Sequence, residues 1–213
     1  MTPPRFRDRR DAGRKLAEKL SASRKAPNLL VLALPRGGVP VAAEVARALD
    51  APLDVFLVRK LGVPGHEELA MGAVASGGVR VLNDEIVHGL GISDQILDAV
   101  EAEGLLELSR RERLYRGGRP PAEIDGRTVI VVDDGLATGA TMRAVVQALK
   151  QHHPGRIIVA VPTASPDVCD ALRADADDVI SVITPEPFYA VGYWYDDFTQ
   201  TGDDEVRNVL AQQ

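Results

Sequence analysis

The sequence predicts an α/β protein in which a parallel sheet carries helices on both faces and a helical flap is inserted into the chain. Continuous apolar runs such as LLVLAL at 29–34 and TVIVVD at 128–133 are typical of strands buried on both faces. Helical patterns alternate with these runs, as the crossovers of a parallel sheet require. Residues 84–124 break the alternation because they are charged and largely helical. We therefore predict a core of residues 1–83 and 125–213 with the flap at 84–124.

The first half of the chain predicts a helix, two strands with a helix between them, and a hairpin. Leu16, Ala17 and Leu20 recur at helical spacing, which predicts an amphipathic helix. The Gly77-Gly78 pair separates AMGAVAS from VRVLN and predicts the turn of the hairpin. Before the hairpin we expect helices over 6–20 and 39–51 and strands over 28–34 and 54–61.

The second half predicts a long helix followed by alternating strands and helices. Ser93 and the Gly117-Gly118 pair bound one long or broken helix. Ser165 followed by Pro166 predicts the start of another helix. After residue 124 we expect strands over 127–134, 156–162 and 177–183 and helices over 139–153, 165–176 and 203–212.

Composition and charge argue against several classes of protein, among them nucleic-acid binders and membrane proteins. The chain has 213 residues, a net charge of −6 and a pI near 5.3, which argues against a general nucleic-acid or membrane-surface binder. The single cysteine, Cys169, excludes a disulfide within the chain and is expected to pack as a small apolar residue. The basic N-terminus lacks the apolar core of a signal peptide, and no apolar run is long enough to span a bilayer. We therefore expect a cytoplasmic protein.

The segment VVDDGLATGATM combines two kinds of recognition in one strand-to-helix turn. Asp133 and Asp134 end a buried strand, and their carboxylates only accept hydrogen bonds, which suits neighbouring hydroxyl groups of a sugar. The amide groups of the helix that follows favour an anion. Gly139 permits close approach to the backbone, and the threonines beside it add hydroxyl donors. A ribose 5-phosphate satisfies both parts of the segment.

Other phosphate-binding motifs fit this segment less well. A Walker A loop requires Gly-Lys before the Ser/Thr, but Ala140 precedes Thr141 here. The dinucleotide pattern G-x-G-x-x-G is absent from the sequence. The acidic pair does not suit a flavodoxin-like phosphate site. The remaining alternative is that Asp133 and Asp134 cap a turn and bind no ligand.

The stretch VIVVDDGLATGAT resembles the signature of type I phosphoribosyltransferases, which bind phosphoribosyl pyrophosphate (PRPP). The resemblance implies that Asp133 and Asp134 hold the ribose 2- and 3-hydroxyls. Gly135 stands where the family often has an aliphatic residue, and we expect it to loosen the loop. The resemblance also assigns the 5-phosphate to the turn formed by Ala137, Thr138, Gly139, Ala140 and Thr141.

The loop LPRGGVPVA resembles the pyrophosphate loop of the same family. The resemblance implies that Arg36, Gly37 and Gly38 bind the leaving diphosphate. The two glycines permit positive φ and close backbone approach. An ordinary strand-to-helix turn is the alternative.

The stretch RKLGVPG resembles a segment of adenine phosphoribosyltransferases. It implies that Arg59 and Lys60 add positive charge near the diphosphate, whereas the alternative is a solvated strand end. The nearby His66, Glu67 and Glu68 suggest a mobile loop in which one residue is a general base on the acceptor, or else an exposed charged turn. They do not complete the zinc motif H-E-x-x-H, because position 70 is alanine.

The acceptor site is the least distinctive part of the sequence. Residues 185–198 hold six of the nine aromatic side chains. By resemblance to the variable hood of the family, we assign stacking on a base to Phe188, Tyr189, Tyr193 and Trp194. Core packing and the interface of a homodimer are the alternatives.

The resemblance implies an enzyme that transfers the phosphoribosyl group of PRPP to a small nitrogen acceptor and releases diphosphate. Asp133, Asp134 and Arg36 are the expected catalytic residues. Mg²⁺ is the expected cofactor, bound mainly through the ligand, with Asp133 and Asp134 contacting it through water. No nucleic acid or membrane partner is expected. The alternative function is a non-catalytic module that senses PRPP or a nucleotide.

Overall fold

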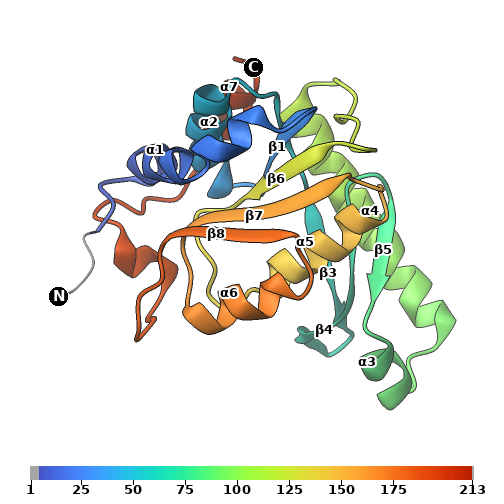
Figure 1. Ribbon diagram of the computed structural model, residues 1–213. Coiled ribbons are helices and arrows are strands. Elements are labelled where there is room, and N and C mark those ends of the chain that lie inside the picture. The colour runs from blue at the N-terminus through green and yellow to red at the C-terminus, as the bar shows by residue number, and fades with distance from the viewer. Residues whose placement is uncertain (1–4, 213) are drawn as a thin grey trace.

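The computed structural model describes residues 5–212 and contains a five-stranded sheet in the order β2-β1-β6-β7-β8 (Figure 1). Each neighbouring pair of strands in this sheet is parallel. Parallel neighbours end at the same edge of the sheet, so the loops that follow β1 and β6 lie together. The strands are β1 (Leu29–Ala33), β2 (Leu53–Val55), β6 (Thr128–Val132), β7 (Arg156–Thr163) and β8 (Asp178–Ile183).

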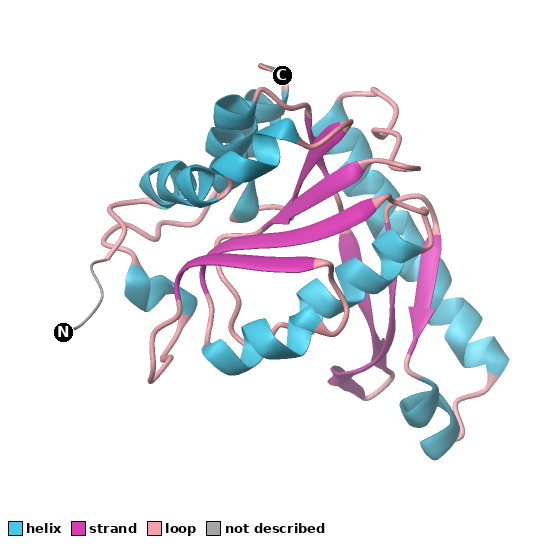
Figure 2. Ribbon diagram, viewed as in Figure 1, coloured by secondary structure: helices cyan, strands magenta, loops and turns pink. Residues whose placement is uncertain are grey.

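Helices cover both faces of this sheet (Figure 2). Val31 and Ile130 pack in the core layer that contains α1, α2 and α7, whereas Leu30 and Val131 pack in the layer that contains α5 and α6. Side chains alternate between faces along a strand, so burial on both sides explains the continuous apolar runs. The predicted α/β class is therefore confirmed. The helices are α1 (Arg9–Lys19), α2 (Gly38–Leu49), α5 (Ala140–Lys150), α6 (Pro166–Arg173) and α7 (Asp203–Leu210), with 3₁₀ turns η1 (Ser21–Lys25) and η2 (Val191–Trp194).

A second sheet of three antiparallel strands lies beside the first. Two predictions for this region were wrong. The strand predicted over 54–61 is divided: β2 ends in the parallel sheet and β3 (Val58–Val63) begins in the other. The chain changes sheets at Phe56, whose amide still donates to Ala33 O at 3.0 Å. The predicted mobile loop around Glu67 is the first part of strand β4 (His66–Ala75). Its charged side chains are exposed because this end of the hairpin projects beyond the core.

The hairpin turn was predicted correctly, and β5 (Val79–Leu82) follows it. Next come a short helix, α3 (Asp84–Gly89), which was not predicted separately, and α4 (Asp94–Arg116). Helix α4 is one unbroken helix of 23 residues, and Ser93 caps it by accepting a hydrogen bond from Ile96 N. Among the described residues, none of the helices has the length and apolar character that crossing a membrane requires.

Helix α4 packs tightly on the hairpin and on the edge of the parallel sheet. A Cβ on Gly104 would lie 3.0 Å from Leu61 Cδ2, so any larger residue at this position would require the Leu61 side chain to shift. At the end of α4, the Arg116 guanidinium donates to Asp54 at 3.1 Å. The division into a core of 1–83 and 125–213 and a flap of 84–124 stays a prediction, and residues 1–4 and 213 of these ranges lie outside the described part.

Candidate active site

The two glycines after β1 bring the loop 34–38 against the acidic pair after β6. Strands β1 and β6 are neighbours, with Ala33 opposite Val132. A Cβ on Gly38 would lie 2.7 Å from Val132 O, and a Cβ on Gly37 would overlap Asp134 Oδ2. Gly37 has φ −60, so the glycines are required here by close contact and not by positive φ.

Asp133 and Asp134 form a partly buried pair of carboxylates with one arginine beside them. Arg9, in the first turn of α1, donates from Nε to Asp134 Oδ2 at 2.8 Å. Burial and the neighbouring Asp134 raise the pKa of Asp133 well above its ordinary value. Burial also raises the pKa of Asp134, although Arg9 opposes the shift. Two carboxylates next to one guanidinium leave excess negative charge, which favours a cation or hydroxyl donors at this position.

The turn after the acidic pair has the backbone expected of an anion site. Gly139 is the N-cap of α5 and has φ +70, so the left-handed conformation favours glycine here. A Cβ on Gly139 would also lie 2.8 Å from Val168 Cγ1. Thr138 and Thr141 are exposed on either side of it. The hydroxyls of both threonines therefore lie at the surface of the turn, next to the N-terminus of α5, where an anion is favoured.

The predicted diphosphate residues lie on two elements, and Arg36 and Arg59 each face a carboxylate. Arg36 lies 3.8 Å from Asp203 of α7, and Arg59 lies 3.6 Å from Glu103 of α4. Lys60 points to the other face of β3, as the next residue of a strand must, and lines a different cavity with Ala140.

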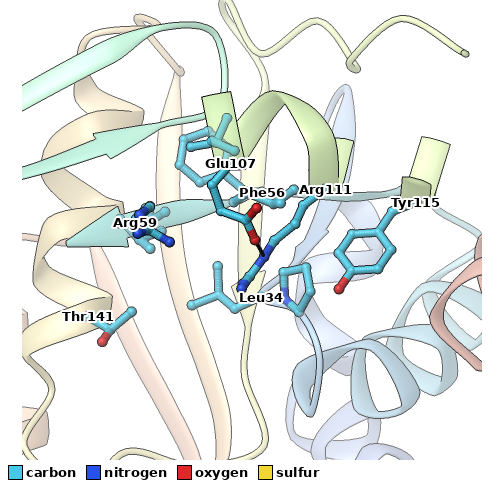
Figure 3. Close-up of a pocket in the computed structure, with 12 residues that line it drawn as sticks. Leu34, Phe56, Arg59, Glu107, Arg111, Tyr115 and Thr141 are labelled. Atoms are coloured by element: carbon cyan, nitrogen blue, oxygen red, sulfur yellow. Dashed lines mark hydrogen bonds and ion pairs between the residues drawn. The ribbon is translucent and has the colours of Figure 1, made fainter. Parts of the chain in front are cut away.

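A cavity of about 90 Å³ lies between the predicted diphosphate loop and the predicted 5-phosphate turn (Figure 3). Pro35 comes from the first of these and Thr141 from the second. Arg59 lines it from β3, and α4 contributes Glu107, Leu108, Arg111 and Tyr115. The structure thus brings together three of the segments that the sequence singled out.

The phosphoribosyl transferase domain family matches residues 7–197 of this chain. The chain belongs to this family. A Mycobacterium tuberculosis (strain CDC 1551 / Oshkosh) protein named "Putative phosphoribosyl transferase MT0597" is 50% identical over 201 residues, which are 94% of this chain and 45% of that protein. This chain therefore spans less than half of the length of that relative.

Other relatives agree with this family over most of the chain. The crystal structure of TT1426 from Thermus thermophilus is 45% identical, covers 98% of both chains and has a TM-score of 0.86. The uracil phosphoribosyltransferase of Lactobacillus gasseri is 28% identical over 163 residues, which are 72% of this chain and 75% of that protein. The sequence prediction of the family is confirmed.

The aromatic cluster of the predicted hood divides into an exposed and a buried part. Tyr189 is 68% exposed and Tyr193 is 46% exposed, with ring centroids 5.2 Å apart. Trp194 is 2% exposed and packs in a small core with Phe6, as the core-packing alternative predicted. Stacking on a base stays a prediction for the accessible rings and for the half-buried Phe188.

The predicted hood, residues 185–198, contacts the acidic turn at Asp134. The residues that make these contacts were not predicted from the sequence. Tyr195 donates its hydroxyl to Asp134 O at 2.5 Å. Arg9 lies over the Phe198 ring at 4.0 Å and donates to Thr199 O at 2.7 Å. The basic first turn of α1 was visible in the sequence, but Arg9 and Asp134 are 125 positions apart, so their pairing could not be predicted.

Proposed function

We propose that this chain transfers the 5-phosphoribosyl group of PRPP to a nitrogen acceptor and releases diphosphate. The observation that carries the proposal is the single turn between β6 and α5, where paired carboxylates precede a glycine N-cap by five residues. Carboxylates for the ribose hydroxyls and amides for the 5-phosphate then lie at the two ends of one ribose 5-phosphate.

In this proposal each side chain acts on a separate part of the donor. Asp133 and Asp134 accept hydrogen bonds from the ribose 2- and 3-hydroxyls, while Ala137 to Thr141 hold the 5-phosphate. Arg36 and Arg59 donate to the diphosphate and stabilise the negative charge that grows on it as the bond to the anomeric carbon breaks. Because the transition state has oxocarbenium character, positioning of donor and acceptor supplies much of the catalysis.

Mg²⁺ is the cofactor that we propose. The donor set fits this ion: the neighbouring carboxylates of Asp133 and Asp134 offer oxygen atoms to Mg²⁺ through water, while PRPP supplies most of its ligands. Among residues 5–212, no group of three or more His, Cys, Asp or Glu side chains could hold a metal ion. When bound, Mg²⁺ would neutralise charge on the leaving diphosphate.

The acceptor that we propose is a nucleobase or a related nitrogen heterocycle. The name of the uracil phosphoribosyltransferase relative supports a base, and so do the accessible rings of Tyr189 and Tyr193. Tyr189 and Tyr193 belong to the same segment as Tyr195, whose hydroxyl donates to Asp134 O.

The decisive experiment incubates purified protein with PRPP, Mg²⁺ and a panel of bases, and measures the release of diphosphate. Base-dependent release that is lost in Asp133→Asn supports the proposal. Binding of PRPP by calorimetry without release for any base would favour the sensing module instead. Absence of PRPP binding would contradict both functions.

A further inference from the structure

We propose that Arg111, on helix α4, binds a phosphate group of the diphosphate moiety, and that it exchanges its partner Glu107 for the ligand. The inference rests on the proposed function. It adds a ligand-binding residue that comes from the inserted segment and from none of the motifs described above.

The position of Arg111 is the first argument. It lines the 90 Å³ cavity together with Pro35, Arg59 and Thr141, each from a segment assigned to the donor. Figure 3 shows the Arg111 side chain reaching from α4 toward Leu34, with the Glu107 carboxylate beside it. A guanidinium in this place lies between the proposed diphosphate loop and the proposed 5-phosphate turn.

The rigidity of α4 is the second argument. Gly104, Leu108, Arg111 and Tyr115 recur at helical spacing and therefore share the face that packs inward. One turn before Arg111, Leu108 is buried; one turn after it, Tyr115 donates to Asp203 Oδ1 at 2.7 Å. The backbone of Arg111 is thus held on both sides, while its side chain stays half exposed.

The charge of Glu107 is the third argument. Arg111 Nε donates to Glu107 Oε1 at 2.7 Å, and Arg110 Nε donates to Oε2 at 2.8 Å. Hydrogen bonds from Arg110 and Arg111 lower the pKa of Glu107 to about 2, so Glu107 stays ionised and is no base near neutral pH. It acts as a counter-ion. An exposed pair of this kind contributes little stability, so a phosphate that accepts two parallel hydrogen bonds can displace it.

Two other arginines also face carboxylates: Arg59, which lines the cavity, and Arg36, which follows the lining residue Pro35. Arg36 faces Asp203 and Arg59 faces Glu103, at 3.8 and 3.6 Å. Their carboxylates belong to α7 and α4, and none of them belongs to a motif assigned to the donor. Two guanidinium groups, from β3 and α4, therefore line the cavity, and each has an exchangeable partner. The competing explanation is that Arg111 and Glu107 form an ordinary i,i+4 pair on a helix surface.

The test compares Arg111→Gln with a matched control, Arg110→Gln. Both arginines bind Glu107 and both side chains are at least half exposed, but of the two only Arg111 lines the cavity. Calorimetry measures the affinity for three probes: PRPP with Mg²⁺, inorganic diphosphate with Mg²⁺, and ribose 5-phosphate. We expect Arg111→Gln to weaken PRPP and diphosphate about tenfold or more, since a charge-assisted hydrogen bond is lost. We expect ribose 5-phosphate to bind unchanged.

Two further variants sharpen the result. Arg111→Lys keeps the charge but loses the two-pronged geometry, so it should fall between the unchanged protein and Arg111→Gln. Glu107→Gln removes the competing charge, so it should bind diphosphate at least as tightly as the unchanged protein. Arg110→Gln should leave all three affinities unchanged.

Two outcomes would overturn the inference alone: PRPP and diphosphate binding as tightly to Arg111→Gln as to the unchanged protein, or an equal loss in Arg110→Gln. A loss in Arg111→Gln that is equally large for ribose 5-phosphate would also overturn it, because the role would then be structural. If the unchanged protein binds none of the three probes, the proposed function falls together with this inference.

Discussion

Asp133 and Asp134 place two carboxyl groups side by side at a position that is partly shielded from water. Burial raises the pKa of both groups, and the negative charge of Asp134 raises the pKa of Asp133 further. Arg9 opposes the shift for Asp134 by a direct hydrogen bond. Such an arrangement is unfavourable for folding, and it is therefore expected where ligand binding requires it.

Asp133→Asn should raise stability at neutral pH while it weakens ribose binding. The pKa of Asp133 is higher in the folded chain than in the unfolded chain, so ionising Asp133 lowers the free energy of unfolding. This loss is absent below about pH 4, where the group is protonated in both states, and complete above the raised pKa. We expect the melting temperature to rise by about 2–4 °C at pH 7. The gain should shrink as the pH falls toward 4.

Thermal denaturation at several pH values measures this difference. Asp197→Asn is the control, because hydrogen bonds from Thr199 lower the pKa of Asp197 and its replacement should not raise stability. A melting temperature for Asp133→Asn that is below that of the unchanged protein at pH 7 would contradict the assignment of a destabilising charge.

Gly37→Ala should abolish the close packing of the diphosphate loop on the acidic pair. The added methyl group would overlap Asp134 Oδ2, and the loop or the carboxylate must move. We expect a loss of stability of about 1–3 kcal/mol and a loss of PRPP affinity of about tenfold or more, since both ends of the donor site shift.

Calorimetry with PRPP and urea denaturation check this prediction. Gly89→Ala is the matched control, because its added methyl group would meet nothing within 4 Å. Equal behaviour of the two variants would show that Gly37 has no role in positioning the acidic pair.

At the scale of elements, the hood and the acidic turn form one packed unit. The sequence suggested that Gly135 would loosen the turn, but the structure shows Val191 filling the space. A Cβ on Gly135 would lie 2.5 Å from Val191 Cγ1 and 3.0 Å from Thr163 Cγ2. The glycine therefore admits a hood side chain against the turn, and the two segments are expected to depend on each other.

Gly135→Ala should destabilise the protein by about 1–3 kcal/mol through this overlap. Val191→Ala removes both clashing methyl groups, so the double variant Gly135→Ala/Val191→Ala should be more stable than the two single effects predict. Urea denaturation of the four proteins measures the coupling. Additive effects would mean that the hood does not rest on Gly135.

At the scale of the whole molecule, the proposed donor site collects groups from β1, β3, β6 and α5. A ligand that contacts all of them binds only the folded chain, so it should stabilise the fold. With PRPP and Mg²⁺ at 100 times the dissociation constant, the expected gain is about 2.7 kcal/mol. This corresponds to a rise in melting temperature of about 5–10 °C.

Differential scanning fluorimetry measures this rise. Ribose without phosphate groups is the control and should give no shift at the same concentration. Ribose 5-phosphate should raise the melting temperature as much as PRPP does when each ligand is in the same excess over its own dissociation constant. Absence of any rise with PRPP would contradict the proposed site.

Much of the fold and the central turn could be predicted from local pattern. Continuous apolar runs predicted the parallel strands. Ser93 and Ser165 marked the starts of helices, and the side chain of each accepts a hydrogen bond from a backbone amide of its helix. The chain's change of sheets at Phe56 could not be predicted, because the run through it is uniformly apolar and local periodicity cannot show which sheet a strand joins.

By itself, the sequence determined the α/β class, the strand-to-helix turn with its carboxylates and glycine, and the family, because each depends on neighbouring residues. The tertiary structure alone decided the partners: Arg9 on Asp134, Val191 over Gly135, and α4 with Arg111 beside the diphosphate loop. These contacts join residues far apart in the chain, and only the packing of helices and strands around the sheet brings such residues into contact.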